Sequence, residues 1–226
     1  MKGCMRPEAV IFDMDGVIVD SMPYHFIAWY EALRPFGVRV NCFDVYTKEG
    51  ERWDRSLGLF LKDAGVEPSK ALMRRIFKRR QKIFAAYFKR YIFQGAAGLL
   101  ASLDAQKYRL ALVTGTPLAE VKRILPAKIR RHFDCIVAGD EVKKGKPHPE
   151  PYLTAAAKLG VAVERCVVVE NAPYGITSAK QAGMFCVAVT TSLPEQYLRH
   201  ADRIVNRLDA IPKILKRACR KQGRNR

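Results

Sequence analysis

The sequence has no long hydrophobic run: no stretch reaches the roughly 18 apolar residues needed to cross a bilayer. The first residues, MKGCMRPEAV, contain no apolar core like that of a signal peptide. Six cysteines are present, but none forms a CxxC pair, and Cys135, Cys166 and Cys186 lie in apolar, strand-like segments. These absences argue against a membrane protein, a disulfide framework and a cysteine-rich metal site. We expect a cytoplasmic protein with buried, reduced thiols.

Acidic residues are missing from two segments that are rich in lysine and arginine. Residues 74–90 contain eight Lys or Arg, and residues 213–226 contain seven, so these segments account for 15 of the net charge of +18. The simplest interpretation is one cationic helix face and a basic, frayed C-terminal tail over 213–226. The alternative is attraction of anionic substrates, or contact with nucleic acid.

Short apolar segments alternate with helical ones after residue 92. The expected strands are 109–113, 134–139, 165–170 and 185–189, and the expected helices are 95–105, 118–125, 150–160, 173–182 and near 207–219. Strands of four to six continuous apolar residues are typical of a parallel sheet that is buried on both faces. With the strand AVIF at 9–12, the pattern predicts a doubly wound α/β domain formed by residues 1–20 and 93–226.

Residues 21–92 lack a convincing strand and predict an all-α domain inserted after the first strand. Apolar residues recur there at three- and four-residue intervals, which is typical of one buried helix face. Within 72–91 the expected buried stripe consists of Leu72, Ile76, Ile83, Phe84, Tyr87, Phe88 and Tyr91.

Polar residues follow each of the central strands. Asp13 and Asp15 follow AVIF, Thr114 and Gly115 follow LALV, Glu170 and Asn171 follow CVVV, and Lys146 lies in the loop after 134–139. Ligands of open α/β sheets bind at the carboxyl ends of the strands, so these residues should converge on one site.

Phosphoryl transfer is the chemistry that this set of residues favours. Asp13 is the candidate nucleophile, and Asp15 is the candidate general acid and base. Thr114, Gly115 and Lys146 are candidates to bind phosphate. Mg²⁺ prefers hard oxygen ligands, which Asp13, the carbonyl of Asp15, and the pair Glu170 and Asn171 can supply.

Four segments, DMDGV, VTGT, GKPHPEPY and VVENAPYGI, resemble the four motifs of the haloacid dehalogenase superfamily. The helical insertion resembles the small cap of its β-phosphoglucomutase-like and phosphoglycolate-phosphatase-like branch. The resemblance covers residues from about 8 to 190. It implies a Mg²⁺-dependent enzyme in which Asp13 is the nucleophile, Asp15 the acid and base, Thr114 and Lys146 the phosphate binders, and Glu170 and Asn171 the acidic motif near the metal.

Two departures from that pattern bear on the activity. Relatives usually carry Asp at the position of Asn171. The mutases of the branch carry Lys-Asn where this sequence has Pro117 and Leu118, and their cap arginine is replaced by Trp53 or shifted to Arg52. We therefore expect a phosphatase acting on a small phosphorylated metabolite, as a monomer or dimer. The alternatives are a sugar-phosphate mutase and a nucleic-acid-binding protein with a degenerate enzyme fold.

Substrate choice is expected to depend on the insertion. By analogy His25, in MPYHFIAW, faces the cleft, and Lys48, Glu49, Arg52 and Trp53 match a specificity loop. The alternatives are a half-buried helix histidine and an exposed charged loop. Gly50 is a candidate hinge for closure of the cap.

Overall fold

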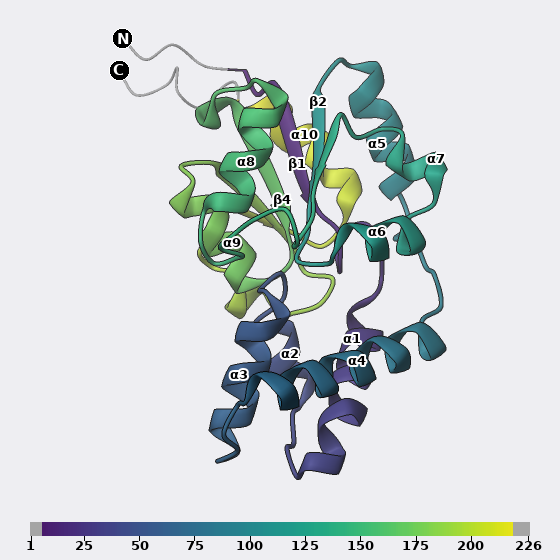
Figure 1. Ribbon diagram of the computed structural model, residues 1–226. Helices are drawn as coiled ribbons and strands as arrows, with labels where there is room; N and C mark the ends of the chain where they lie inside the picture. Colours follow the sequence, from purple (N-terminus) through teal and green to yellow (C-terminus); the bar gives the residue numbers. More distant parts are fainter. Residues whose placement is uncertain (1–5, 219–226) are drawn as a thin grey trace.

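The computed structural model describes residues 6–218 and contains one parallel sheet of six strands in the order β3-β2-β1-β4-β5-β6 (Figure 1). The strands are β1 (Ala9–Asp13), β2 (Arg109–Val113), β3 (Cys135–Val137), β4 (Cys166–Glu170), β5 (Phe185–Val189) and β6 (Arg203–Val205). The predicted doubly wound parallel sheet is confirmed. The sequence did not indicate β6, because its three residues form only a short edge strand beside β5.

Helices cover both faces of the sheet because alternate residues of each strand point to opposite sides. Val10 and Phe12 of β1 pack with α5 (Ala96–Ala105), α6 (Leu118–Ile124), α7 (Ala127–Arg130) and α10 (Ile211–Ala218). Ala9 and Ile11 pack with α8 (Glu150–Leu159) and α9 (Pro173–Gln181). The short 3₁₀ helices of this part are Val163–Arg165, Glu195–Tyr197 and Leu208–Ala210.

The C-terminal segment differs from its prediction. The last helix, α10, begins at Ile211 after the 3₁₀ turn Leu208–Ala210, rather than near residue 207. Residues 213–218 fell within both the predicted helix and the predicted frayed tail; they belong to the helix, and Leu215 is buried against the sheet. Apolar burial every fourth residue, at Ile211 and Leu215, holds the helix in place despite its basic composition. The rest of the predicted tail, 219–226, lies outside the described residues.

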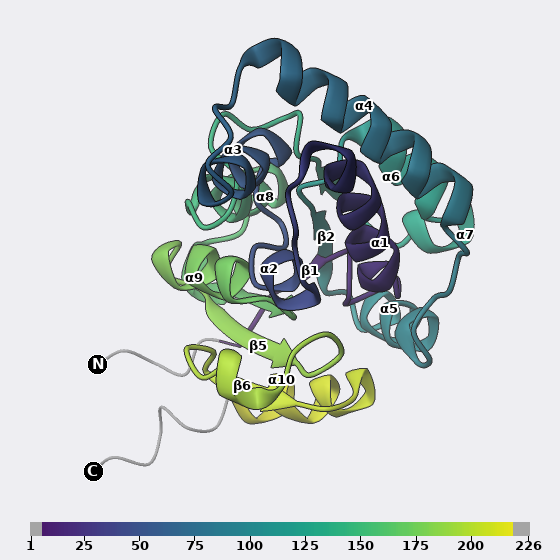
Figure 2. The ribbon, with the colours of Figure 1, turned by 90° about the horizontal axis from the view of Figure 1, so that it is seen from below.

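The segment between residues 22 and 87 contains four α-helices, one short 3₁₀ helix and no strand. The helices are α1 (Met22–Leu33), α2 (Cys42–Tyr46), α3 (Trp53–Asp63) and α4 (Lys70–Tyr87), and the 3₁₀ helix is Arg34–Phe36. They enclose their own apolar cluster, which includes Trp29, Leu33, Leu57, Leu61 and Ile76. We refer to this segment as the cap. Helix α4 runs beside α1 along the outer edge of the cap (Figure 2).

Two connections join the cap to the sheet domain, and they lie side by side. Val19 forms an antiparallel bridge with Ile92. The backbone N–H of Asp20 donates to the carbonyl of Tyr91 at 2.9 Å, and the N–H of Phe93 donates to the carbonyl of Ile18 at 3.0 Å. A rotation of the cap would therefore act on this pair of segments.

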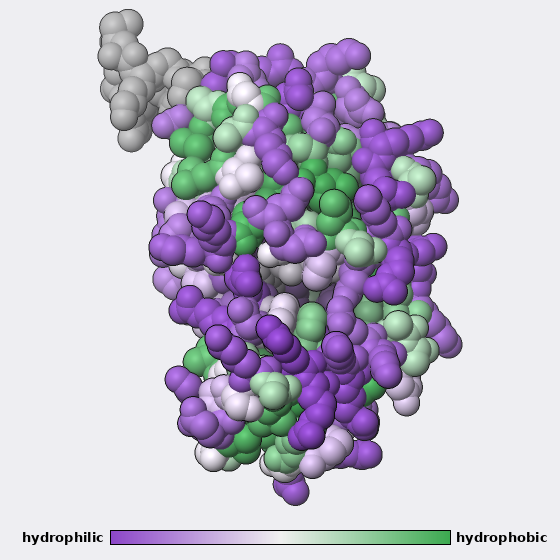
Figure 3. All heavy atoms as spheres, viewed as in Figure 1, coloured by the Kyte–Doolittle hydropathy of each residue, from purple (hydrophilic) through white to green (hydrophobic). Residues whose placement is uncertain are grey.

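The structure around helix α4 differs in two details from the buried stripe predicted for residues 72–91. Tyr87 and Tyr91 are exposed, at 56% and 57%, because they lie where the chain leaves the cap. Arg80, which belongs to the basic segment, is instead 8% exposed and lies between the buried Ile76 and Phe84. The other basic side chains of α4 are exposed, and Figure 3 shows hydrophilic residues gathered over this helix.

Within residues 6–218, no helix combines the length and apolarity needed to cross a membrane. The cysteines of this part, Cys42, Cys135, Cys166 and Cys186, are free thiols, and Cys166 and Cys186 are buried as expected.

Candidate active site

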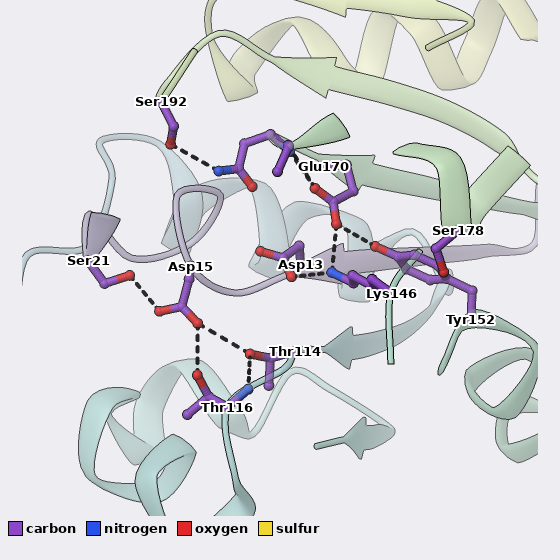
Figure 4. A network of polar contacts seen from close by, with 12 residues as sticks. Asp13, Asp15, Ser21, Thr114, Thr116, Lys146, Tyr152, Glu170, Ser178 and Ser192 are labelled. Atoms are coloured by element: carbon purple, nitrogen blue, oxygen red, sulfur yellow. Dashed lines mark hydrogen bonds and ion pairs between the residues drawn. The ribbon is translucent and has the colours of Figure 1, made fainter. Parts of the chain in front are cut away.

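The carboxyl ends of β1, β2 and β4 bring the predicted residues to one edge of the sheet (Figure 4). Asp13 ends β1, Glu170 ends β4, and Thr114 follows β2. With Asp15 and Lys146, these side chains are at most 4% exposed. The parallel register places them together because neighbouring strands end at the same level.

Lys146 links the two acidic strand ends of the site, Asp13 and Glu170. Its ammonium group donates to Oδ1 of Asp13 at 2.5 Å and to Oε1 of Glu170 at 2.6 Å. Burial alone would lower the pKa of Lys146, but Asp13 and Glu170 raise it, so the lysine is a permanent cation. The ammonium also lies 5.1 Å from the centre of the Tyr152 ring.

Glu170 uses both carboxylate oxygens on protein donors. Oε1 accepts from Lys146 and from the hydroxyl of Tyr152 at 2.8 Å. Oε2 accepts from the backbone N–H groups of Asn171 at 2.7 Å and Ala172 at 3.1 Å. These contacts give Glu170 a role in fixing Lys146 and the end of β4. That it also ligates a metal stays a prediction.

Asp15 is held by four side chains from both parts of the molecule. Oδ1 accepts from Ser21 at 2.5 Å and lies 3.0 Å from Nε2 of His25. Oδ2 accepts from the hydroxyls of Thr114 at 3.2 Å and Thr116 at 3.1 Å. Burial would raise the pKa of Asp15, but its interactions with His25, Ser21 and Thr116 lower it to about 2.

Arg80 determines which nitrogen of His25 carries the proton. The guanidinium can only donate, and its Nη2 contacts Nδ1 of His25. Nδ1 is therefore the acceptor, and Nε2 carries the hydrogen that is donated to Asp15. In this arrangement His25 donates to Asp15, and Asp15 is a carboxylate.

The residues around Asp13 fit a divalent cation. Oδ2 of Asp13 and Oδ1 of Asn171 are both buried and have no hydrogen-bond partner. The buried carboxyl groups of Asp13 and Glu170 share one buried lysine, so this part of the site has an excess of negative charge. Burial raises the pKa of Asp13 to about 8; Lys146 opposes the rise, and the charges of Glu170 and Asp15 add to it.

Mg²⁺ suits this donor set because it binds few protein oxygens and keeps several waters. Residues 6–218 contain no group of three or more His, Cys, Asp or Glu side chains placed to hold a metal ion by themselves. Two free oxygens that leave room for water match a magnesium site better than a zinc site.

A cavity of about 60 Å³ separates the cap from the sheet domain. The residues that line it include His25, Lys48, Glu49, Trp53, Arg80 and Glu120. The predicted cap residues His25, Lys48 and Glu49 are therefore placed at the cavity. Burial and the nearby charges of Asp15 and Asp13 raise the pKa of Glu49. Their part in substrate recognition stays a prediction.

Arg52 and Gly50 have other positions than the analogy suggests. Arg52 does not line this cavity; its Nη1 donates to the carbonyl of Val142 in the sheet domain at 3.1 Å. Gly50 lies away from the two connecting segments and touches the sheet domain. A Cβ on Gly50 would be 2.4 Å from Cδ of Lys146, and one on Gly115 would be 2.9 Å from the carbonyl oxygen of Gly50. Gly50 thus contacts the sheet domain, and its role as a hinge stays a prediction.

Sequence reasoning assigned no role to Ser21, Thr116, Arg80, Glu120 and Tyr152, although it placed Thr116 beside Thr114 at the site edge. Thr116 follows Thr114 by two residues, a spacing that places both hydroxyls near Asp15. Arg80 was counted with the exposed residues of the basic segment. Its spacing of four from both Ile76 and Phe84 could have shown that it lies on the buried face of the helix. For Glu120 the sequence offers no signal, because its partners belong to the cap.

Comparison with known proteins places this site in a family. The model of the haloacid dehalogenase-like hydrolases matches residues 7–183. The phosphorylated carbohydrates phosphatase of Thermotoga maritima is 31% identical, over 78% of this chain and 82% of the relative. The β-phosphoglucomutase of Bacillus subtilis is also 31% identical, over 83% and 85%. The crystal structure of β-phosphoglucomutase from Clostridium difficile superposes with a TM-score of 0.81 at 25% identity, over 93% of this chain and 97% of that one.

Proposed function

This chain belongs to the haloacid dehalogenase-like hydrolase family, and we propose that it is a Mg²⁺-dependent phosphatase that hydrolyses a small phosphomonoester, such as a sugar phosphate, through an aspartyl phosphate. The observation that carries the proposal is the state of Asp13. One carboxylate oxygen is held by Lys146 and the other is buried without a partner. A carboxylate that is fixed and yet incompletely satisfied is suited to attack phosphorus and to share a cation.

The reaction has two steps on Asp13. In the first, a carboxylate oxygen of Asp13 attacks phosphorus, the bond to the leaving oxygen breaks, and Asp15 gives its proton to that oxygen. In the second, Asp15 takes a proton from water, which attacks phosphorus and releases inorganic phosphate and free Asp13. Asp15 must therefore enter the first step protonated, although its four contacts favour the carboxylate before substrate binds.

Lys146, Asn171 and the loop after β2 support these steps. Lys146 neutralises one oxygen of Asp13 and can do the same for a phosphate oxygen. Asp13 and Asn171 would hold Mg²⁺, with the backbone carbonyl of Asp15 as a further ligand. The cation supplies charge neutralisation between the phosphate dianion and the carboxylates. Thr114 and Gly115 are proposed to donate to the phosphate.

The test is phosphate release from a panel that includes fructose 1-phosphate, other sugar phosphates, phosphoglycolate, nucleotides and an aryl phosphate. Mg²⁺-dependent release that is lost in Asp13→Asn supports the proposal. Turnover that survives in Asp13→Asn overturns the mechanism.

A sugar-phosphate mutase is the second candidate, and the similarity to the Bacillus β-phosphoglucomutase favours it. Pro117 and Leu118 argue against it, because neither side chain can bind a distal phosphate. Conversion of β-glucose 1-phosphate into the 6-phosphate with a bisphosphate primer, without release of free phosphate, would establish the mutase instead.

A further inference from the structure

Glu120 of the sheet domain projects to the cap and has two partners there. Its side chain is 6% exposed. Oε1 accepts from Nε2 of Gln81 at 2.6 Å, and Oε2 lies 3.8 Å from Nη1 of Arg80. Glu120 follows Thr116 by four residues. It therefore lies between the loop that is proposed to bind phosphate and the wall of the cavity.

Arg80 is buried, charged and incompletely satisfied. Its guanidinium lies 5.0 Å from the ring centre of Phe84 and 5.5 Å from that of Trp29. Nη1 faces Glu120 and Nη2 contacts His25, whereas Nε is buried and has no partner. A buried donor without a partner beside a cavity marks a position where a ligand oxygen can accept a hydrogen bond.

The cavity beyond the phosphate site holds more carboxyl groups than cations. Glu49, Glu51 and Glu120 line it together with Lys48 and Arg80. The ammonium of Lys48 lies against the Phe60 ring, 5.3 Å from its centre, and the positive charge of Arg80 is balanced by Glu120. Trp29 and Trp53 supply aromatic walls, which suit the apolar faces of a sugar ring or polyol chain.

From this arrangement we infer that Glu120 is a specificity-determining residue: by neutralising Arg80 it excludes substrates with a second phosphate and restricts the site to phosphate esters whose leaving group is uncharged and hydroxylated. The inference rests on the proposed function and narrows its substrate class. Without Glu120, Arg80 would be a buried guanidinium that contacts His25 but has no carboxylate partner, and such a cation binds phosphate strongly. With Glu120 in place, a second phosphate meets the carboxylate that already holds this cation. A hydroxyl group, in contrast, can accept from Nε of Arg80 and donate to Glu120 without a charge conflict.

The test compares two ligands that differ by one phosphate, fructose 1-phosphate and fructose 1,6-bisphosphate. Binding is measured by calorimetry with Mg²⁺ in an Asp13→Asn background, so that neither ligand is consumed. We expect the parent to prefer the monophosphate. Glu120→Gln, which retains an acceptor for Gln81, should improve the relative affinity for the bisphosphate by about tenfold, because it removes one close like charge.

Two further variants make the result specific. Adding Arg80→Gln to Glu120→Gln should abolish the gain, since the gain requires a free guanidinium. Glu8→Gln removes the same charge at the opposite edge of the sheet, where Glu8 pairs with Arg165, and should leave the ratio of affinities unchanged. An unchanged ratio in a folded Glu120→Gln variant, a parent that prefers the bisphosphate, or binding of neither ligand would each overturn the inference. Failure of the proposed function would appear separately, as absence of Asp13-dependent phosphate release.

Discussion

The ammonium nitrogen of Lys146 lies 2.5 Å from Oδ1 of Asp13, at the centre of a site with too few cations for its carboxylates. One lysine is shared by the carboxyl groups of Asp13 and Glu170, and all three side chains are buried. The protein thus keeps an unfavourable charge distribution at the carboxyl ends of β1 and β4. A divalent cation would neutralise this excess of negative charge. The effect of the excess on protein stability should be measurable without substrate.

Asp13→Asn should stabilise the metal-free protein at alkaline pH. Because the pKa of Asp13 is raised to about 8 from the ordinary 3.8, the folded state retains a proton that the unfolded chain loses between these values. The free energy of unfolding therefore falls as the pH rises from about 4 to about 8. Without this carboxyl group the free energy of unfolding should fall less with pH, and the variant should be more stable than the parent near pH 8.

Urea unfolding in the presence of a chelator, at several pH values, measures this difference. Asp209→Asn is the matched control, since Asp209 is an exposed carboxylate paired with Arg207. A variant at position 13 that is less stable than the parent near pH 8 would contradict the charge argument.

Asn171→Asp should strengthen Mg²⁺ binding. The unpartnered Oδ1 of Asn171 would become a carboxylate oxygen. The hydroxyl of Ser192, which now accepts from Nδ2 of Asn171 at 2.9 Å, can reorient and donate to the other oxygen. A new negative charge in contact with the cation should tighten binding about tenfold. Calorimetric titration with Mg²⁺ measures the affinity directly. Asn206→Asp, at an exposed position, is the control, and equal affinities in all three proteins would remove Asn171 from the metal site.

Gly50→Ala should impair turnover by preventing cap closure. The new Cβ would lie 2.4 Å from Cδ of Lys146, and the φ of 78° is unfavourable for alanine. Displacement of the loop or of Lys146 should lower kcat/KM by about 100-fold. Gly65→Ala is the matched control, because Gly65 has a φ of 70° and nothing within 4 Å of its Cβ position. If both variants lose the same activity, backbone strain rather than closure accounts for the effect.

The exposed basic face of α4 should accelerate the arrival of anionic substrates. Arg74, Lys78 and Lys82 follow one another at intervals of four residues and are all exposed. Their joint replacement by alanine should lower kcat/KM a few-fold at low salt, leave kcat unchanged, and have no effect at high salt. Unchanged kcat/KM, combined with loss of salt-dependent binding to a labelled RNA, would instead support the nucleic-acid alternative.

Local sequence patterns predicted the sheet and the edge at which the site lies, because polar or charged residues directly follow the apolar residues of each central strand. The rule that parallel strands end at one edge was sufficient to predict that Asp13, Thr114 and Glu170 lie close together. The cap–sheet contacts were not predictable in this way. Arg80 of α4 pairs with Glu120 of α6, 40 positions later in the sequence. The residues around either side chain contain no signal that would identify its partner.

Predictions from the basic composition were wrong at two places where side chains are buried. Seven basic residues suggested a frayed end after residue 213, yet Ile211 and Leu215 anchor α10 to the sheet. The eight cations of 74–90 suggested a single exposed face, yet aromatic rings and Glu120 accommodate one of them inside. In both segments the decisive contacts are tertiary.

Detection of a phosphoryl group on Asp13 tests the central claim most directly. The enzyme is mixed with its best substrate and Mg²⁺, quenched in acid within one turnover, and analysed by peptide mass spectrometry. We expect one transient, acid-stable phosphoryl adduct on the peptide that contains Asp13, and none in Asp13→Asn. An active enzyme that carries no adduct during turnover, or carries it on another residue, would overturn the aspartyl-phosphate mechanism.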